Sequence, residues 1–263
     1  MGVEEKLCII CSWRRHCQIR FTPADDGEDV QCHDFTRDYT INDVEADRTA
    51  LEAQLERWGR KGRTRFKPCI TISREAGARG SEIGRRLAAE LRMDLLASEI
   101  ISRIAESTQM SAKVVQSLGE RHITLLDNWI SSFFAERHFR PDTYFQHLVK
   151  VIKTAGEHGN AIILGRGAGL ILPQNRTFRV RVIAPFEKRI ENVINSRGCG
   201  RDEARRYVIK GDDYRKAFIM KYFHEDIASA ALYDLVVNMA GITIDDAVVI
   251  IKQAFQVRHF SEG

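Results

Sequence analysis

The sequence predicts an α/β fold, a parallel sheet with helices on both faces, preceded by a small cysteine-rich module. From residue 66 onward, short apolar runs alternate with longer segments of helical periodicity, a pattern typical of parallel sheets covered on both faces. Four of the six cysteines fall within the first 32 residues. The 263 residues can bury a sizeable core. We therefore expect a cysteine-rich module at residues 1–40, a linker helix at 41–66 and an α/β domain at 67–258.

The composition favours a globular protein. Hydrophobic residues make up 44% of the chain, and 40 basic against 36 acidic residues leave a formal charge of +4. This charge is too small to favour a nucleic-acid partner. A protein that binds an anionic small molecule could carry the same charge. No run approaches the length of a membrane span, and the first residues contain no apolar core of signal-peptide length. We expect a cytoplasmic protein without a membrane segment.

The elements of the domain follow from apolar spacing. In the linker, Leu51, Leu55 and Trp58 recur at helical spacing before Gly59. Beyond it we expect strands at 68–73, 160–167, 178–185 and 232–240. We expect helices at 81–92, 98–108, 186–198, 202–223 and 243–260, and a mostly helical stretch at 112–158. Thr243 is predicted to cap the last helix.

The stretch "CITISREAGARGSEIGRRLAAEL", residues 69–91, has the layout of a phosphate-binding loop. A strand delivers the chain, small residues let backbone N–H groups turn toward an anion, and a helix N-terminus follows. The stretch departs from G-x-x-x-x-G-K-[ST], because arginines stand at both glycine positions and Gly80 stands at the lysine position; only Ser81 matches. Local sequence leaves open the alternative of an ordinary strand-to-helix turn.

Arginines flank this turn. Arg74 and Arg79 keep the cationic character that the missing lysine would supply, and an arginine fork can hold phosphate in bidentate fashion. Arg74 is the candidate for the lysine's charge. The alternative is a surface arginine at the end of a strand.

The segment "ISREAGARGSEIGRRLAAEL" is similar to the opening of the cytidylate kinase-like family, whose members often read S-R-E-x-G-S-G-G-x-x-I-G and lack the usual lysine. Downstream, "ILGRGAGLIL", "VRVIAPFEKRIENV", "KGDDYRKAF" and "LYDLVVNMAGITIDDAVVII" resemble later segments of the family in the same order. The likeness covers about residues 68–256. It implies a three-layer P-loop NTPase-type parallel sheet.

The resemblance implies phosphoryl transfer from ATP, with Mg²⁺, to a nucleoside monophosphate such as CMP or dCMP. The Ser81 hydroxyl would be a Mg²⁺ ligand. The residues that would cradle the triphosphate are Gly77, Ala78, Arg79, Gly80 and Ser81.

Arg166 stands between two glycines after the apolar run "AIIL", where open α/β sheets bind ligands. The resemblance implies that it contacts the monophosphate, and the alternative is a plain turn. In cytidylate kinases an aspartate follows this arginine. Here Gly167 stands in that place, so recognition of cytosine is not implied.

The segment "KGDDYR" matches the D-x-x-R of the family's lid. The resemblance implies that Arg215 clamps the transferring phosphates and that Asp212 reaches the acceptor ribose, with Lys210 adding charge. Because the two matched residues share one helical face, a surface salt bridge is the alternative. Arg103 matches an acceptor-binding arginine loosely, and Arg189 is expected to be a solvated helix residue.

The N-terminal cysteines follow the pattern C-x2-C-x5-C-x14-C. Four thiolates could complete a tetrahedral zinc site, and they could also hold an iron–sulfur cluster. His16 and His33 allow a mixed-ligand zinc site, and isolated buried thiols are the remaining alternative. The predicted ligands are Cys8, Cys11, Cys17 and Cys32.

Three hypotheses of function follow. The first is a nucleoside monophosphate kinase with an N-terminal metal module. The second is a catalytically impaired nucleotide-binding regulatory protein with a zinc or iron–sulfur sensing module. The third is a regulator that reads redox state or a nucleic-acid partner through its cysteines and uses the α/β domain as a scaffold.

Overall fold

The computed structural model describes part of the chain, and all of that part lies in one compact unit spanning residues 53–263. The described residues are 67–106, 108–118, 126, 128, 130–133 and 142–261. The cysteine-rich module predicted at 1–40, with its four candidate ligands, and the linker helix predicted at 41–66 lie outside them.

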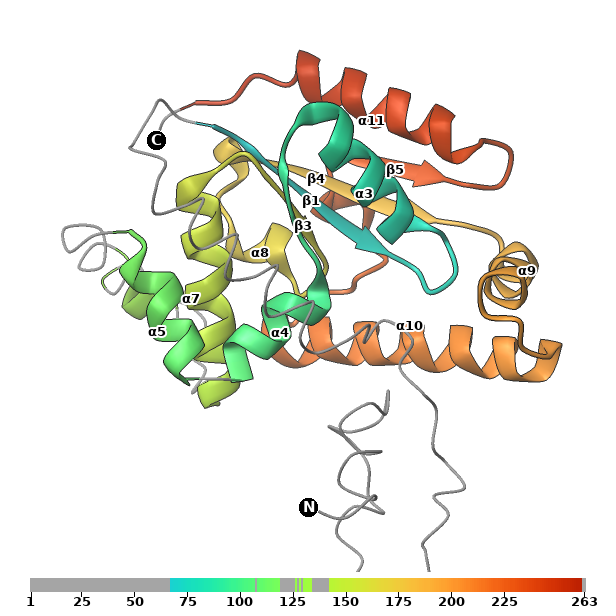
Figure 1. Cartoon of the computed structure of the whole chain (residues 1–263), viewed down its shortest axis with the longest axis horizontal. Helices are drawn as coiled ribbons and strands as arrows, with labels where there is room; N and C mark the ends of the chain where they lie inside the picture. The colour runs from blue at the N-terminus through green and yellow to red at the C-terminus, as the bar shows by residue number, and fades with distance from the viewer. Residues whose placement is uncertain are drawn as a thin grey trace, which may run out of the picture. The chain divides into compact units, whose positions relative to one another are not determined.

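A five-stranded parallel sheet forms the centre of the domain (Figure 1). Its strand order is β2-β3-β1-β4-β5, and every neighbouring pair is parallel. The strands are β1 (Cys69–Arg74), β2 (Asp94–Leu96), β3 (Ala161–Leu164), β4 (Thr177–Ile183) and β5 (Leu235–Asn238). The predicted α/β fold is thus confirmed. Strand β2 was not predicted, because three residues are too few to show a periodic pattern.

Two helices, α3 (Gly80–Leu91) and α11 (Ile244–Val257), cover one face of the sheet (Figure 1). Alternate residues of β1 and β4, such as Ile72 and Val180, pack with Leu87 of α3 and Val248 of α11 in the main core. The predicted cap of α11 is confirmed: the Thr243 side chain accepts a hydrogen bond in a reciprocal capping box.

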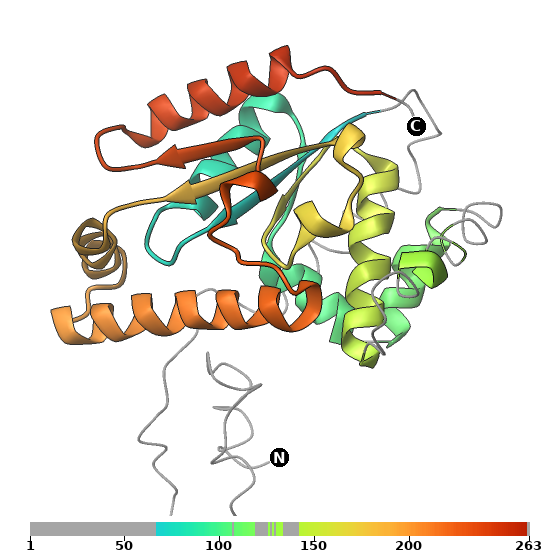
Figure 2. The same ribbon diagram turned by 180° about the vertical axis from the view of Figure 1, so that it is seen from behind.

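The other face is approached by α8 (Ala168–Ile171), which was not predicted, and by α7 (Thr143–His158) (Figure 2). A Cβ on Gly169 would lie 3.0 Å from the Thr71 hydroxyl, so α8 sits close against this face. Two further helices, α4 (Ser98–Glu106) and α5 (Thr108–Gln116), pack against α7. In the stretch predicted to be mostly helical, the end of α5, residues 126, 128 and 130–133, and all of α7 are helical.

After β4 the chain forms α9 (Phe186–Arg197) and the long α10 (Arg201–Phe223). Apolar residues of the two helices, Ile190 and Val193 with Ala204 and Val208, form a second small core. Short 3-10 turns at Gln174–Arg176 and Ala230–Leu232 precede β4 and β5. None of the helices in the described ranges is long and apolar enough to cross a bilayer.

A partly buried ion pair joins β4 to the residue before β5. The Arg179 side chain donates to both carboxylate oxygens of Asp234, at 3.2 and 3.0 Å, and its backbone N–H donates at 2.8 Å. Burial by itself would raise the pKa of Asp234, but the Arg179 hydrogen bonds and charge outweigh it and hold the pKa below the ordinary 3.8.

Asp234→Asn is therefore expected to lower the free energy of unfolding by about 1–3 kcal/mol at neutral pH. Because the folded-state pKa is depressed, the wild-type carboxylate contributes fully above the unfolded-state pKa and loses that contribution as the pH falls through the folded-state value. Urea unfolding of both proteins from pH 7 downward should show that the difference between their free energies of unfolding becomes smaller at acid pH. A difference that stays constant would contradict this assignment.

Candidate active site at the carboxyl end of the sheet

The loop between β1 and α3 is a tight turn built from small residues. Gly77 and Arg79 have positive φ angles of 79° and 63°. A Cβ on Gly77 would lie 2.5 Å from the Arg189 carbonyl oxygen, and a Cβ on Gly80 would lie 2.7 Å from the Arg74 Cβ. Close packing therefore demands glycine at both positions, and between them Ala78 is fully buried.

The N-terminus of α3 follows this loop directly. The N–H groups of Glu82 and Ile83 donate to the Arg79 carbonyl. Those of Gly80 and Ser81 come first in the helix, so no carbonyl one turn earlier in the helix accepts from them. Helix amides in this position, together with the helix dipole, favour an anion.

Arg74 lies under the loop rather than at the surface. Only 8% of the residue is exposed, and its Nη2 donates to the Ser98 hydroxyl of α4 at 2.9 Å. A Cβ on Gly165 would collide with its Nη1, so the guanidinium lies beside the turn after β3. Arg74 thus connects the loop between β1 and α3 with the turn after β3. No sequence signal singled out Ser98.

Arg79 has a different environment. Its guanidinium pairs with Glu82 on the first turn of α3, with Nη2 2.9 Å from Oε2, and 47% of the side chain is exposed. Of the two arginines that flank the loop, Arg74 is therefore the buried one.

Arg166 reaches from the turn after β3 to α10. It has a left-handed backbone with φ 53°. Its Nη1 donates to the Tyr214 hydroxyl at 2.9 Å, and the guanidinium lies over the Tyr214 and Phe218 rings. The next residue, Gly167, also has positive φ, and a Cβ there would collide with the Phe223 ring. With Phe223 in this place, an aspartate at position 167 has no room.

Asp212 joins α10 to the loop. Its Oδ1 accepts from the Ala76 N–H at 2.7 Å, and its Oδ2 pairs with Arg189. A Cβ on Gly211 would lie 2.9 Å from the Ala76 Cβ, so the helix and the loop are in close contact. Arg215 Nη1 lies 3.6 Å from Asp212 Oδ1 and donates to the Gly211 carbonyl at 3.2 Å. The Asp212 carboxylate therefore does not form a surface salt bridge alone, because it also binds the loop and Arg189.

Two residues that matched the family more loosely lie on helices: Arg103 is in α4, and Lys210 is exposed on α10.

Arg189 was predicted to be a solvated helix residue, and this prediction is wrong. Only 8% of it is exposed, and its guanidinium donates to the carbonyls of Ala184 and Ala76 at 3.0 and 3.3 Å. It also pairs with Asp212 and lies 3.4 Å from a Glu75 carboxylate oxygen. Arg189 is thus the link between the loop, the end of β4 and α10.

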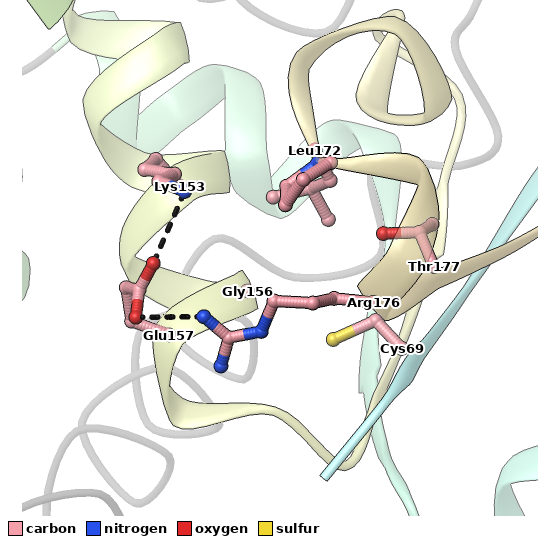
Figure 3. Close-up of a pocket in the computed structure, with 8 residues that line it drawn as sticks. Cys69, Lys153, Gly156, Glu157, Leu172, Arg176 and Thr177 are labelled. Carbon is pink, nitrogen blue, oxygen red and sulfur yellow. Dashed lines mark hydrogen bonds and ion pairs between the residues drawn. The ribbon is translucent and has the colours of Figure 1, made fainter. Parts of the chain in front are cut away.

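A separate pocket lies at the opposite, amino end of the sheet (Figure 3). Its charges pair within it: Glu157 lies 3.1 Å from Lys153 and 3.2 Å from Arg176. Burial raises the pKa of the Cys69 thiol to about 11, which keeps it protonated at neutral pH. The start of β1 and the start of β4 line this pocket, so it is not part of the loop site. Within the described ranges, no cluster of three or more His, Cys, Asp or Glu could hold a metal ion.

The five parallel strands and the helices on both faces define an α/β domain, in which a glycine turn joins β1 to the N-terminus of α3. Residues 69–241 match the model of the cytidylate kinase-like family. Because this match covers most of the chain, the protein belongs to that family. The described domain accordingly has a kinase-like α/β fold.

The chain is similar to several solved structures at low identity. An uncharacterized protein from Eubacterium ventriosum is 17% identical, with a TM-score of 0.52, and the match covers 73% of this chain and 100% of that one. A shikimate kinase from Acinetobacter baumannii is 15% identical, with a TM-score of 0.42 and coverage of 72% and 93%. A gluconokinase from Sinorhizobium meliloti is 9% identical, with a TM-score of 0.43 and coverage of 74% and 100%. No curated protein matches the sequence.

Proposed function

We propose that this protein transfers the γ-phosphoryl group of ATP to a nucleoside monophosphate, CMP, dCMP or a related acceptor. The observation that carries the proposal is the meeting of three segments that are far apart in the sequence. The loop after β1 contacts α10 through Ala76 and Asp212, the turn after β3 contacts α10 through Arg166, and Arg74 joins the loop to that turn. Two phosphorylated substrates that must react would be held between such segments.

The loop fits the triphosphate of ATP. The first amides of α3 have no acceptor within the helix and would donate to phosphate oxygens, and Arg74 would supply the charge of the absent lysine. The Ser81 hydroxyl, on the first turn of α3, would bind Mg²⁺, which offsets the phosphate charge when it is bound. The residues proposed to hold ATP are Gly77, Ala78, Arg79, Gly80 and Ser81.

The reaction requires no nucleophilic side chain. An oxygen of the acceptor phosphate forms a bond to the γ-phosphorus, the bond from that phosphorus to the ADP oxygen breaks, and ADP leaves with the electron pair. Arg166 and Arg215 stabilise the charge that develops on the transferring group. In this proposal Asp212, whose Oδ1 accepts from the Ala76 N–H, also accepts a hydrogen bond from the acceptor ribose.

A coupled assay with ATP, Mg²⁺ and CMP, dCMP, UMP or AMP tests the proposal. We expect at least one of these acceptors to be phosphorylated. If ATP binds but no acceptor is phosphorylated, the second function applies, a catalytically impaired nucleotide-binding regulatory protein. Two positions favour that alternative: Gly80 stands at the lysine position of the phosphate-loop pattern, and Gly167 stands where cytidylate kinases have an aspartate.

We also propose that the four N-terminal cysteines hold zinc or an iron–sulfur cluster. Metal analysis and the visible spectrum of anaerobically purified protein should show one of these, since four thiolates suit both. The double variant Cys8→Ser, Cys11→Ser should lose the metal. Cys199→Ser, which changes a free cysteine beyond α9, should retain it. Wild-type protein without bound metal would refute this module.

A further inference from the structure

Arg181 is a buried arginine on β4 for which no carboxylate among the described residues serves as a partner. Only 7% of it is exposed. Three other arginines in the described ranges are equally buried. Arg179 pairs with Asp234 and Arg189 pairs with Asp212, while Arg74 donates to the Ser98 hydroxyl. A buried guanidinium without a counter-ion is costly. Its charge therefore points to an anion that binds beside it.

The Arg181 side chain is held in place by neutral groups. Its Nη1 donates to the Ser73 hydroxyl at 2.8 Å, and the guanidinium lies over the Tyr233 ring, 5.8 Å from its centre. The Tyr233 hydroxyl in turn donates to the Ile227 carbonyl at 2.8 Å. A guanidinium carries five N–H donors, so one bond to Ser73 leaves most of them available to a ligand with several acceptor oxygens.

The position of Arg181 brings it to the carboxyl end of the sheet. It is paired in register with Ser73, next to Arg74, and it alternates with the core residues Val180 and Val182. Its side chain therefore lies on the face opposite α3. On that face α8 covers Thr71 and Arg179, and Ser73 and Arg181 lie one strand repeat nearer the carboxyl end. The turn that carries Arg166 immediately precedes α8.

We propose that Arg181, oriented by Ser73 and Tyr233, binds the phosphate group of the acceptor monophosphate as a second cation beside Arg166. This assignment rests on the proposed kinase function, because it names a further binding residue of the same site. A phosphate monoester carries close to two negative charges at neutral pH and binds arginine in bidentate fashion. Two arginines approaching from β4 and from the turn after β3 match that charge.

Isothermal titration of the full-length protein with inorganic phosphate and with CMP tests the proposal. Arg181→Gln should raise both dissociation constants about tenfold or more, since it removes a charge-assisted contact. The dissociation constants of Arg181→Lys should lie between those of the wild type and those of Arg181→Gln, because lysine keeps the positive charge and loses the bidentate guanidinium. Arg85→Gln, the same charge change at an exposed position of α3, should leave both constants unchanged, and ATP should bind Arg181→Gln as it binds the wild type.

Each outcome decides the assignment. If the wild type binds neither phosphate nor CMP, or if Arg181→Gln binds both as tightly as the wild type, the assignment is overturned. If Arg181→Gln does not fold, the variants Ser73→Ala and Tyr233→Leu are titrated in its place. Unchanged dissociation constants for phosphate and CMP in both variants would also overturn the assignment. Loss of phosphate binding in Arg181→Gln, in a wild type that phosphorylates no acceptor, supports the anion site and removes the kinase function. If the wild type is an active kinase and Arg181→Gln leaves its KM for CMP unchanged, the kinase function is supported and the Arg181 assignment is overturned.

Discussion

Arg166→Ala is expected to lower kcat about a hundredfold or more, because in the proposed reaction it removes a fixed cation that stabilises the transferring phosphoryl group. The guanidinium is held by the Tyr214 hydroxyl and by the Tyr214 and Phe218 rings, so it is already oriented before substrates bind. Steady-state kinetics with ATP and the acceptor that the coupled assay identifies would measure the effect.

The backbone at this position calls for a matched variant. Arg166 has φ 53°, a conformation that asparagine tolerates better than alanine does. Arg166→Asn should therefore lose as much activity while its thermal midpoint stays near that of the wild type. Tyr214→Phe, which removes only the accepting hydroxyl, should have a smaller effect. Near-normal kcat in both Arg166 variants would remove this residue from the active site.

Arg189→Met is expected to lower the free energy of unfolding by about 1–3 kcal/mol, because it leaves the partly buried carboxylates of Asp212 and Glu75, and two carbonyl groups, without their donor. The pair joins α9 to Asp212 of α10, and the same guanidinium donates to the carbonyls of Ala76 and Ala184. The variant should also loosen the loop, so its KM for ATP should rise. Urea unfolding followed by circular dichroism measures the first effect.

The chain contains a matched control for this pair. Arg201 and Glu187 also join α10 and α9, but their side chains are 61% and 62% exposed. Exposed pairs contribute about 0–1 kcal/mol, so Arg201→Met should be nearly neutral. Equal destabilisation by both arginine variants would contradict a special role for Arg189.

Elements with a long periodic pattern could be predicted from sequence, whereas short ones could not. The predicted helix at 202–223 corresponds to α10 at Arg201–Phe223, and the capping residue of α11 was identified. Strand β2 and helix α8 have three and four residues. Segments of that length acquire their structure from neighbours in the sheet, so local sequence carries little signal for them.

Arg189 shows what apolar spacing could have revealed. Phe186, Ile190 and Val193 form one face of α9, and Arg189 is adjacent to Ile190 and three residues after Phe186. It therefore lies toward the side that packs on the rest of the domain. Arginine is mostly exposed in proteins, and this general tendency favours the wrong expectation at this position. The alternating arginines of "FRVRV" in a strand expected to be covered on both faces were a similar signal for Arg181.

The sequence by itself determined the α/β class, the order of the main elements, the position of the phosphate-type loop and the family, because periodicity and motif order are local properties of the chain. Only the tertiary structure decided which cations have partners. Arg79 pairs with Glu82 at the surface, Arg74 is buried between the loop and the turn after β3, and Arg181 has no carboxylate partner among the described residues. These differences depend on which side chains the fold brings together from distant segments, and the net charge at each point of the site is the sum over those neighbours.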